Sequence, residues 1–248
     1  MIVVIAGREL RSLFVSPLAW VVLGVVQFLF AWVMFGQLEA YLNVAARIAK
    51  LEAPPGVTDL VIAPAISNLA VVLMLVMPLL SMRLLAGERA DGTLSLLVSA
   101  PVGHASIILG KYLGLMAFAL LQIGLLMLAP LSLLLITNLD LGKLAAAVLG
   151  LVLLVSAYAA VGVFMSSITA RPVVAAMGTL GVLLLLLLLD WAGQSGDSEL
   201  FAYMGLNTHF QPFAKGLFDT ADLAYFLLLD LFFLALAIRR LEVLRLRG

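Results

Sequence analysis

The chain has 248 residues, of which 65% are hydrophobic and 11% are charged, and its mean hydropathy is +1.21. A water-soluble domain carries about 25% charged and about 45–50% apolar residues, so this composition excludes a soluble enzyme, a nucleic-acid-binding domain and a disordered chain. The formal net charge is zero and cysteine is absent, which excludes disulfides and thiolate metal sites. The composition therefore predicts an integral membrane protein.

Charge-free runs along the chain predict the membrane-spanning helices. Five such runs contain 18 to 28 residues, and about 20 apolar residues in a helix cross a hydrocarbon core about 30 Å thick. The first is too long for the apolar core of a cleavable signal peptide, so we expect it to remain attached. A sixth, shorter run, Leu223–Ile238, carries Asp230 near its middle. The expected spans, in chain order, lie at about 15–38, 60–84, 110–136, 144–168, 172–190 and 219–240.

The distribution of lysine and arginine orients these spans. If the N-terminus is cytoplasmic, six spans return the C-terminus to the same side, and ten of the 14 basic residues are then cytoplasmic. This excess follows the positive-inside rule. The sequence therefore predicts an all-α integral membrane protein with six transmembrane helices, both termini cytoplasmic, forming a single domain over 1–248. Its outer loops are expected at 39–59 and 190–218, and its longest cytoplasmic connection at 83–104.

No motif in the chain predicts catalysis, metal binding or nucleotide binding. Gly110 and Lys111 are preceded by a glycine seven positions back, where a phosphate-binding loop needs five, and Tyr112 replaces the hydroxyl residue that binds Mg²⁺. His104 and His209 are too far apart in sequence to suggest a histidine metal site. We expect no catalytic, cofactor-binding or metal-binding residue. The acidic residues near the last outer loop are interpreted as a solvated face: Asp190, Asp197, Glu199, Asp219 and Asp222.

Two glycine pairs and one acidic residue stand out within the spans. Gly110 and Gly114 in the third span, and Gly178 and Gly181 in the fifth, allow close helix approach. Each pair serves packing within one subunit or a contact between two subunits. Asp230 would cost about 2.5–3.5 kcal/mol at the bilayer centre, so it is expected to face protein or water. A relay, a substrate contact, a structural hydrogen bond within the bundle and a position closer to the outer interface all remain open for it.

The cytoplasmic segment 83–104 predicts two short helices. The first continues the second span and ends at Asp91-Gly92, a helix-stop signal. The second begins with Thr93 or Asp91 as its cap and stops before Pro101. It presents three apolar side chains on one face, Leu94, Leu97 and Val98. Such a face covers a partner protein or lies on the membrane surface.

This segment resembles the coupling segment of type-2 ATP-binding-cassette (ABC) exporter permeases, whose pattern is E-R-x-x-G-T-L-E-x-L-L-x-x-P-[VI]. The positions that fall in register are Glu88, Arg89, Gly92, Thr93, Leu94, Leu96, Leu97 and Pro101. Ser95 departs from the pattern, because the family usually has glutamate there. Residues 8–20 are similar to the amphipathic elbow that precedes the first span in the gliding-motility-type branch, and residues 207–226 are similar to its outer loop and last span. The elbow residues are Arg8, Glu9, Arg11 and Pro17.

The resemblance implies a permease subunit of an ATP-driven exporter in the bacterial cytoplasmic (inner) membrane. It implies that a second permease, identical or related, pairs through the first, second and fifth spans. Two separate ABC ATPases, which bind the ATP and Mg²⁺, would dock on the coupling helix, and an accessory protein with an extracytoplasmic domain is a further candidate partner. Three alternatives stay open: an ABC complex acting in protein maturation, assembly or signalling, a non-transporting scaffold, and an intramembrane enzyme.

Overall fold

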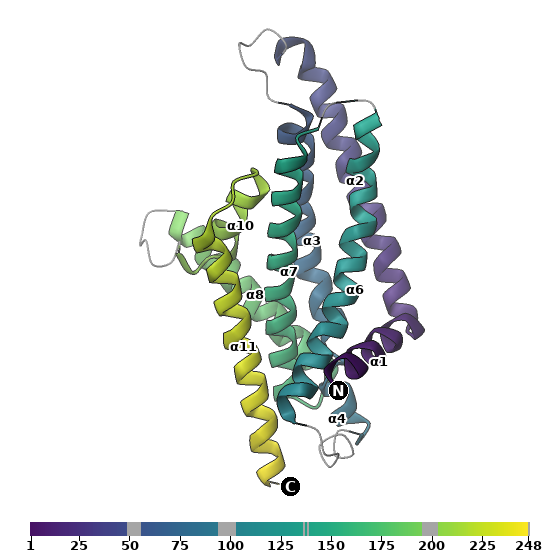
Figure 1. Cartoon of the computed structure of the whole chain (residues 1–248), viewed down its shortest axis with the longest axis vertical. Helices are drawn as coiled ribbons and strands as arrows, with labels where there is room; N and C mark the ends of the chain where they lie inside the picture. Colours follow the sequence, from purple (N-terminus) through teal and green to yellow (C-terminus); the bar gives the residue numbers. More distant parts are fainter. Residues whose placement is uncertain (49–55, 94–102, 136, 138, 195–202, 248) are drawn as a thin grey trace.

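The computed structural model describes residues 1–48, 56–93, 103–135, 137, 139–194 and 203–247. Within these residues every element is helical, and six helices are long and apolar enough to cross a membrane. The long helices run along one axis, and both chain termini lie at the same end of the bundle, which we call the termini end (Figure 1). The prediction of an all-α membrane protein with six spans is confirmed.

The chain begins with a bend between two helices. α1 (Ile2–Val15) lies obliquely across the termini end, and α2 (Pro17–Ile48) runs from it along the bundle (Figure 1). Ser16 is extended, as a residue before proline prefers, and proline is well tolerated as the first residue of a helix. Nε1 of Trp20 donates a hydrogen bond to the carbonyl oxygen of Phe14 at 2.9 Å. Local sequence therefore produces the elbow.

The second long segment is not a single regular helix. A π-helical turn, η1 (Thr58–Ile62), leads into α3 (Ala63–Ser81), and a turn then separates α3 from α4 (Ala86–Ala90). After α4, Gly92 adopts a left-handed conformation with φ of 72°, which costs glycine no steric strain. The predicted helix stop at Asp91-Gly92 is confirmed.

After α4, the described residues form four further long helices and one short one. These elements are α6 (His104–Ser132) with its terminal 3₁₀ turn η2 (Leu133–Leu135), α7 (Leu141–Ile168), α8 (Pro172–Gln194), α10 (Leu206–Ala214) and α11 (Thr220–Arg247). α10 lies inside the expected outer loop 190–218. α2 continues ten residues beyond Leu38, the expected end of the first span, because residues 39–48 contain neither glycine nor proline to end the helix.

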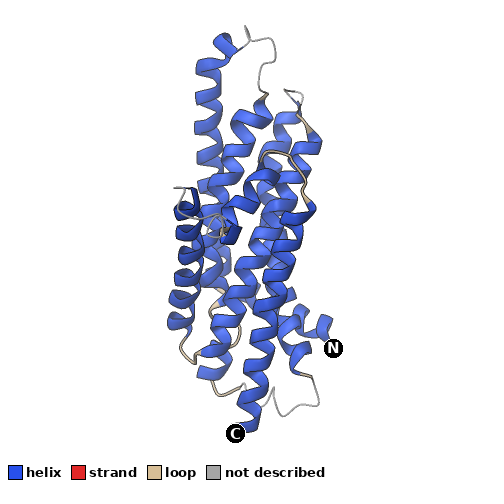
Figure 2. Ribbon diagram, turned by 90° about the vertical axis from the view of Figure 1, so that its left-hand side faces the viewer, coloured by secondary structure: helices blue, strands red, loops and turns tan. Residues whose placement is uncertain are grey.

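α7 is the central helix of the bundle. It packs against α3, α6, α8, α10 and α11, and 72% of its most apolar stretch is buried, compared with 17% for α8. The peripheral helices α2 and α8 therefore keep wide apolar faces that the described residues leave exposed. Figure 2 shows the same elongated bundle from the side, with the N-terminal helix projecting sideways near the termini end.

Candidate functional site

A buried lysine joins three helices at the termini end. Lys111 of α6 is 2% exposed, and its Nζ lies 2.9 Å from Oε2 of Glu9 in α1 and 2.8 Å from Oε1 of Glu88 in α4. The two glutamates are themselves only 16% and 18% exposed. We call Glu9, Glu88 and Lys111 the charged junction. It connects the elbow, the end of the second long segment and the third span.

The charged junction holds α1 and α4 against α6, because separating either carboxylate from Lys111 would leave a buried charge without a counter-charge. Removing one member of a buried ion pair typically costs about 3–5 kcal/mol, since the remaining charge stays buried without a counter-charge. The junction combines one formal positive charge with two negative ones, and Oε2 of Glu88 has no hydrogen-bond partner among the described residues. The formal charges of the junction therefore sum to −1, so Lys111 alone does not neutralise both glutamates.

Two glycines allow α1 to lie close to α6. A Cβ atom at Gly110 would lie 2.7 Å from Cβ of Ile5, and one at Gly114 would lie 2.7 Å from Cβ of Glu9. Side chains do not pack at such distances, so the elbow helix can make this approach only because α6 has no side chain at these two positions. The glycine pair of the third span thus serves packing within one subunit.

We expect Gly114→Ala to loosen the charged junction without unfolding the bundle. The added methyl group would meet Cβ of Glu9 and, at 2.9 Å, the carbonyl oxygen of Ala6, and overpacking of this kind costs about 1–3 kcal/mol. The thermal unfolding midpoint of the purified protein in detergent should fall. Gly124→Ala is the control on the same helix, since a Cβ there would meet no described atom within 4 Å. Equal midpoints for the two variants would contradict this role of Gly114.

A serine of α7 fixes the turn between α3 and α4. Oγ of Ser166 accepts hydrogen bonds from the backbone N–H groups of Leu85 and Ala86, both at 3.0 Å, and donates one to the carbonyl oxygen of Met82 at 3.1 Å. The helix break leaves these backbone groups without their helical partners, and buried backbone groups need replacements. The serine supplies them, so the position of α4 depends on α7 as well as on α6.

The predicted coupling residues fall partly within the described structure. Glu88 belongs to the charged junction, and Nη1 of Arg89 donates to the carbonyl oxygen of Ile168, the last residue of α7, at 3.4 Å. Gly92 provides the left-handed turn after α4, and the hydroxyl of Thr93 donates to the carbonyl oxygen of Glu88 at 3.2 Å. The other predicted coupling residues lie outside the described residues: Leu94, Leu96, Leu97, Val98 and Pro101.

The predicted elbow residues have different surroundings. Glu9 contacts Lys111, Arg8 and Arg11 are exposed on α1, and Pro17 begins α2. A cavity of about 260 Å³ lies beside the charged junction, between α1, the start of α2, α3, α4 and α6. Besides the junction residues, its charged lining comprises Arg8, Arg83 and Asp91. The termini end therefore has a polar space directly next to the buried lysine.

The sequence places Lys111 as a basic residue at the cytoplasmic edge of the third span, but it does not predict the ion pairs with Glu9 and Glu88. A signal was present, since Lys111 lies between Gly110 and Gly114 and is the only lysine, arginine or acidic residue of its helix. A lysine at such a position needs a buried counter-charge. The sequence does not tell which acidic residue supplies it, because Glu9 is 102 residues away.

A second polar cluster joins α8, α10 and α11 away from the termini end. Nδ1 of His209 lies 2.6 Å from Oδ1 of Asp222, and its Nε2 lies 2.9 Å from the carbonyl oxygen of Tyr203. Oδ1 of Asp190 accepts hydrogen bonds from the backbone N–H of Thr208, at 2.9 Å, and from its hydroxyl. These contacts hold the short helix α10 between the two long ones.

The interpretation of the outer acidic residues as a solvated face is wrong for two of them. Asp190 and Asp222 are both buried, because each carboxylate pairs with a polar group of α10. Asp219 is exposed, as expected, and Asp197 and Glu199 lie outside the described residues. Among the described residues there is no group of three or more His, Asp or Glu side chains that could hold a metal ion.

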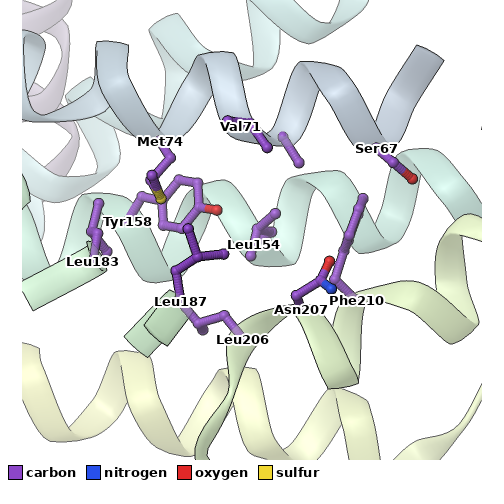
Figure 3. Close-up of a pocket in the computed structure, with 11 residues that line it drawn as sticks. Ser67, Val71, Met74, Leu154, Tyr158, Leu183, Leu187, Leu206, Asn207 and Phe210 are labelled. Atoms are coloured by element: carbon purple, nitrogen blue, oxygen red, sulfur yellow. The ribbon is translucent and has the colours of Figure 1, made fainter. Parts of the chain in front are cut away.

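A small cavity lies between α3, α7, α8 and α10 (Figure 3). Its lining is mainly apolar, with the side chains of Ser67, Tyr158 and Asn207 as polar members. The volume open to the centres of water molecules is about 40 Å³. On this measure a cavity needs roughly 10–15 Å³ to hold one water molecule. The space suits a few water molecules and is too small for a larger solute.

Most of the chain matches the model of a known protein family. The family is described as "ABC-2 family transporter protein", and the match covers residues 3–194, or 192 of the 248 residues. The matched region includes α1, α4 and α6, and so all three residues of the charged junction. A comparison with curated proteins finds no match.

Proposed function

The chain belongs to the ABC-2 family of transporter proteins, and from this membership we propose that it is the permease subunit of an ATP-driven exporter. It is a multi-pass membrane protein with six candidate spans. Its sequence contains no nucleotide-binding motif, so ATP and Mg²⁺ are expected on separate ABC ATPases. In this proposal two ATPases act on two paired permeases, which together form the translocation pathway.

The charged junction is the structural observation that supports coupling of the spans to an ATPase. α4 leads directly into the segment that resembles the ATPase-coupling helix, and Glu88 ties α4 to α6 while Ser166 ties it to α7. A displacement of the coupling segment by an ATPase would therefore reach two spans through short polar contacts. Rigid contacts of this kind suit the transfer of a domain motion into the membrane.

We propose that the second permease packs on the uncovered faces of α2 and α8. Gly181 of α8 has no described atom within 4 Å of an added Cβ, so it offers a small contact surface to a neighbouring helix. Gly178 does not offer such a surface, because a Cβ atom added there would meet the side chain of Met165 in α7. Of the two glycines predicted at this contact, Gly181 is therefore the better candidate.

The finer family assignment and the location are also proposals. The gliding-motility-type branch is supported by the sequences of the elbow and of residues 207–226, and the second of these lies beyond the matched region 3–194. The cytoplasmic position of both termini is supported by the excess of basic residues that this orientation gives to the cytoplasmic side. The bacterial cytoplasmic membrane is what the family resemblance implies.

Labelling of single cysteines is expected to give this orientation directly, because the native chain has no cysteine. Ala90 is exposed at the end of α4, and Leu217 is exposed between α10 and α11. In intact cells a membrane-impermeant maleimide should label Leu217→Cys, whereas Ala90→Cys should react only after permeabilisation. Labelling of Ala90→Cys in intact cells would contradict the orientation.

The proposed function is tested by isolating the tagged chain from its native membrane in mild detergent. We expect an ABC ATPase to co-purify in a one-to-one ratio with the permease, and the complex in proteoliposomes to transport substrate only with ATP. Recovery without an ATPase would refute the coupling. A complex that hydrolyses ATP without transport would instead support a role in protein maturation, assembly or signalling.

A further inference from the structure

Asp230 lies in the middle of the last span, ten residues after Thr220 and thirteen before Val243. Its side chain is buried between three helices. Oδ2 of Asp230 in α11 lies 2.7 Å from Oγ of Ser156 in α7 and 3.3 Å from the hydroxyl oxygen of Tyr112 in α6. The carboxyl group therefore has polar neighbours on both helices that pack against it.

The hydroxyl of Ser156 lies within hydrogen-bond distance of two oxygen atoms, one of them in Asp230, but it has only one proton to donate. Oγ of Ser156 lies 2.7 Å from the carbonyl oxygen of Leu153 and 2.7 Å from Oδ2 of Asp230. A hydroxyl group donates one hydrogen bond, whereas a carbonyl oxygen and an ionised carboxylate can only accept. If Asp230 were ionised, one of these two short oxygen pairs would have no proton between them. A proton on Oδ2 satisfies both.

The other carboxyl oxygen provides a second, independent observation. Oδ1 of Asp230 is buried and has no hydrogen-bond partner among the described residues. In an ionised carboxylate this atom would carry half of a negative charge without a donor, which is costly in a low-dielectric interior. In a carboxylic acid it is a neutral carbonyl oxygen, and the cost is much smaller. The ion pairs found in the described part of the chain do not include Asp230.

We propose that Asp230 is a proton-binding site in the middle of the membrane and that its carboxylic acid donates a hydrogen bond to Oγ of Ser156. Ser156 then donates to Leu153, and the Tyr112 hydroxyl donates to Oδ2. The described groups that face the carboxyl group are Ser156 from α7 and the titratable Tyr112 from α6. The bound proton thereby links α11 to α7, while the hydroxyl of Tyr112 links it to α6, and Asp230 acts as a positioning residue for α11.

Infrared spectroscopy of the purified chain at neutral pH, in a maltoside detergent that contains no carbonyl group, tests the proposal. A protonated carboxylic acid has a C=O stretching band at higher frequency than amides and ionised carboxylates. We expect this band in the wild type and its loss in Asp230→Asn. Ser156→Ala should move the band to higher frequency, because the acid loses its acceptor. Asp219→Asn, at the exposed start of the same helix, should leave the band unchanged.

Thermal unfolding provides a second readout. Asp230→Asn keeps a donor and an acceptor in place, so its midpoint should stay close to that of the wild type, whereas Asp230→Leu should lower the midpoint. Three results would overturn the proposal: a wild-type spectrum without the band, a band that persists unchanged in Asp230→Asn, or an equal fall of the midpoint in both variants. These measurements need no ATPase, so they are independent of the proposed function.

Discussion

Lys111→Met is expected to destabilise the permease by about 3–5 kcal/mol and to abolish ATP-driven transport. The substitution keeps a long unbranched side chain and removes the cation shared by Glu9 and Glu88. Both carboxylates are largely buried, and an ion pair broken on one side leaves a desolvated charge without compensation. Denaturant unfolding in detergent measures the stability, and proteoliposomes containing the ATPase measure the transport.

Lys143→Met is the matched control at the other end of the bundle. Lys143 pairs with Asp59 at 2.7 Å, but the two side chains are 38% and 36% exposed. Solvent-exposed pairs typically contribute no more than about 1 kcal/mol, so this variant should keep nearly full stability and normal transport. If both lysine variants lost the same stability, burial of the charged junction would not be the cause.

A triple variant separates the stability of the junction from its role in coupling. Glu9→Gln, Glu88→Gln and Lys111→Met together remove all three charges, and replacing a complete buried ionic group by neutral residues is often close to neutral in stability. We expect the triple variant to recover much of the stability lost in Lys111→Met while transport stays impaired. Recovery of transport as well would show that the charged junction stabilises the fold without transmitting motion.

Leu97→Asp is expected to abolish the association with the ATPase while the permease remains inserted in the membrane. Leu97 lies outside the described residues, so this expectation rests on the sequence pattern, which puts Leu94, Leu97 and Val98 on one face of a short helix. Burial of each side chain against a partner contributes about 1.5–3 kcal/mol. Aspartate would lose that contribution and leave an unpaired charge in the interface. Co-purification and transport assays measure the loss.

Leu184→Asn controls for general damage to membrane insertion. Leu184 is 39% exposed on α8, within a run of seven leucines at 183–189 whose exposed side chains are expected to face lipid or the second permease. This variant should insert and retain the ATPase. Should Leu97→Asp also retain the ATPase at normal stoichiometry, the segment after Thr93 would be a helix on the membrane surface, and the coupling assignment would be wrong.

The six spans and the turns at the termini end could be predicted because they depend on local sequence. An apolar run enters the hydrocarbon core segment by segment, so length and lack of charge suffice to find it. Ser16-Pro17 and Asp91-Gly92 act through the backbone preferences of single residues. The end of α2 was harder to predict, because charged residues mark the edge of an apolar run but do not end a helix.

Only the tertiary structure decided which side chains meet. Glu9 is 102 residues from Lys111, and Tyr112 is 118 residues from Asp230, so no spacing in the sequence pairs them. The apolar pattern does not help either, since α7 and α8 have the same span hydropathy of 2.5, yet α7 is central and α8 peripheral. Lipid and protein interior are similarly apolar, so hydrophobicity does not distinguish the two faces of a span. Close approach at glycines, and the cost of leaving a polar group unpaired inside the bundle, select the arrangement.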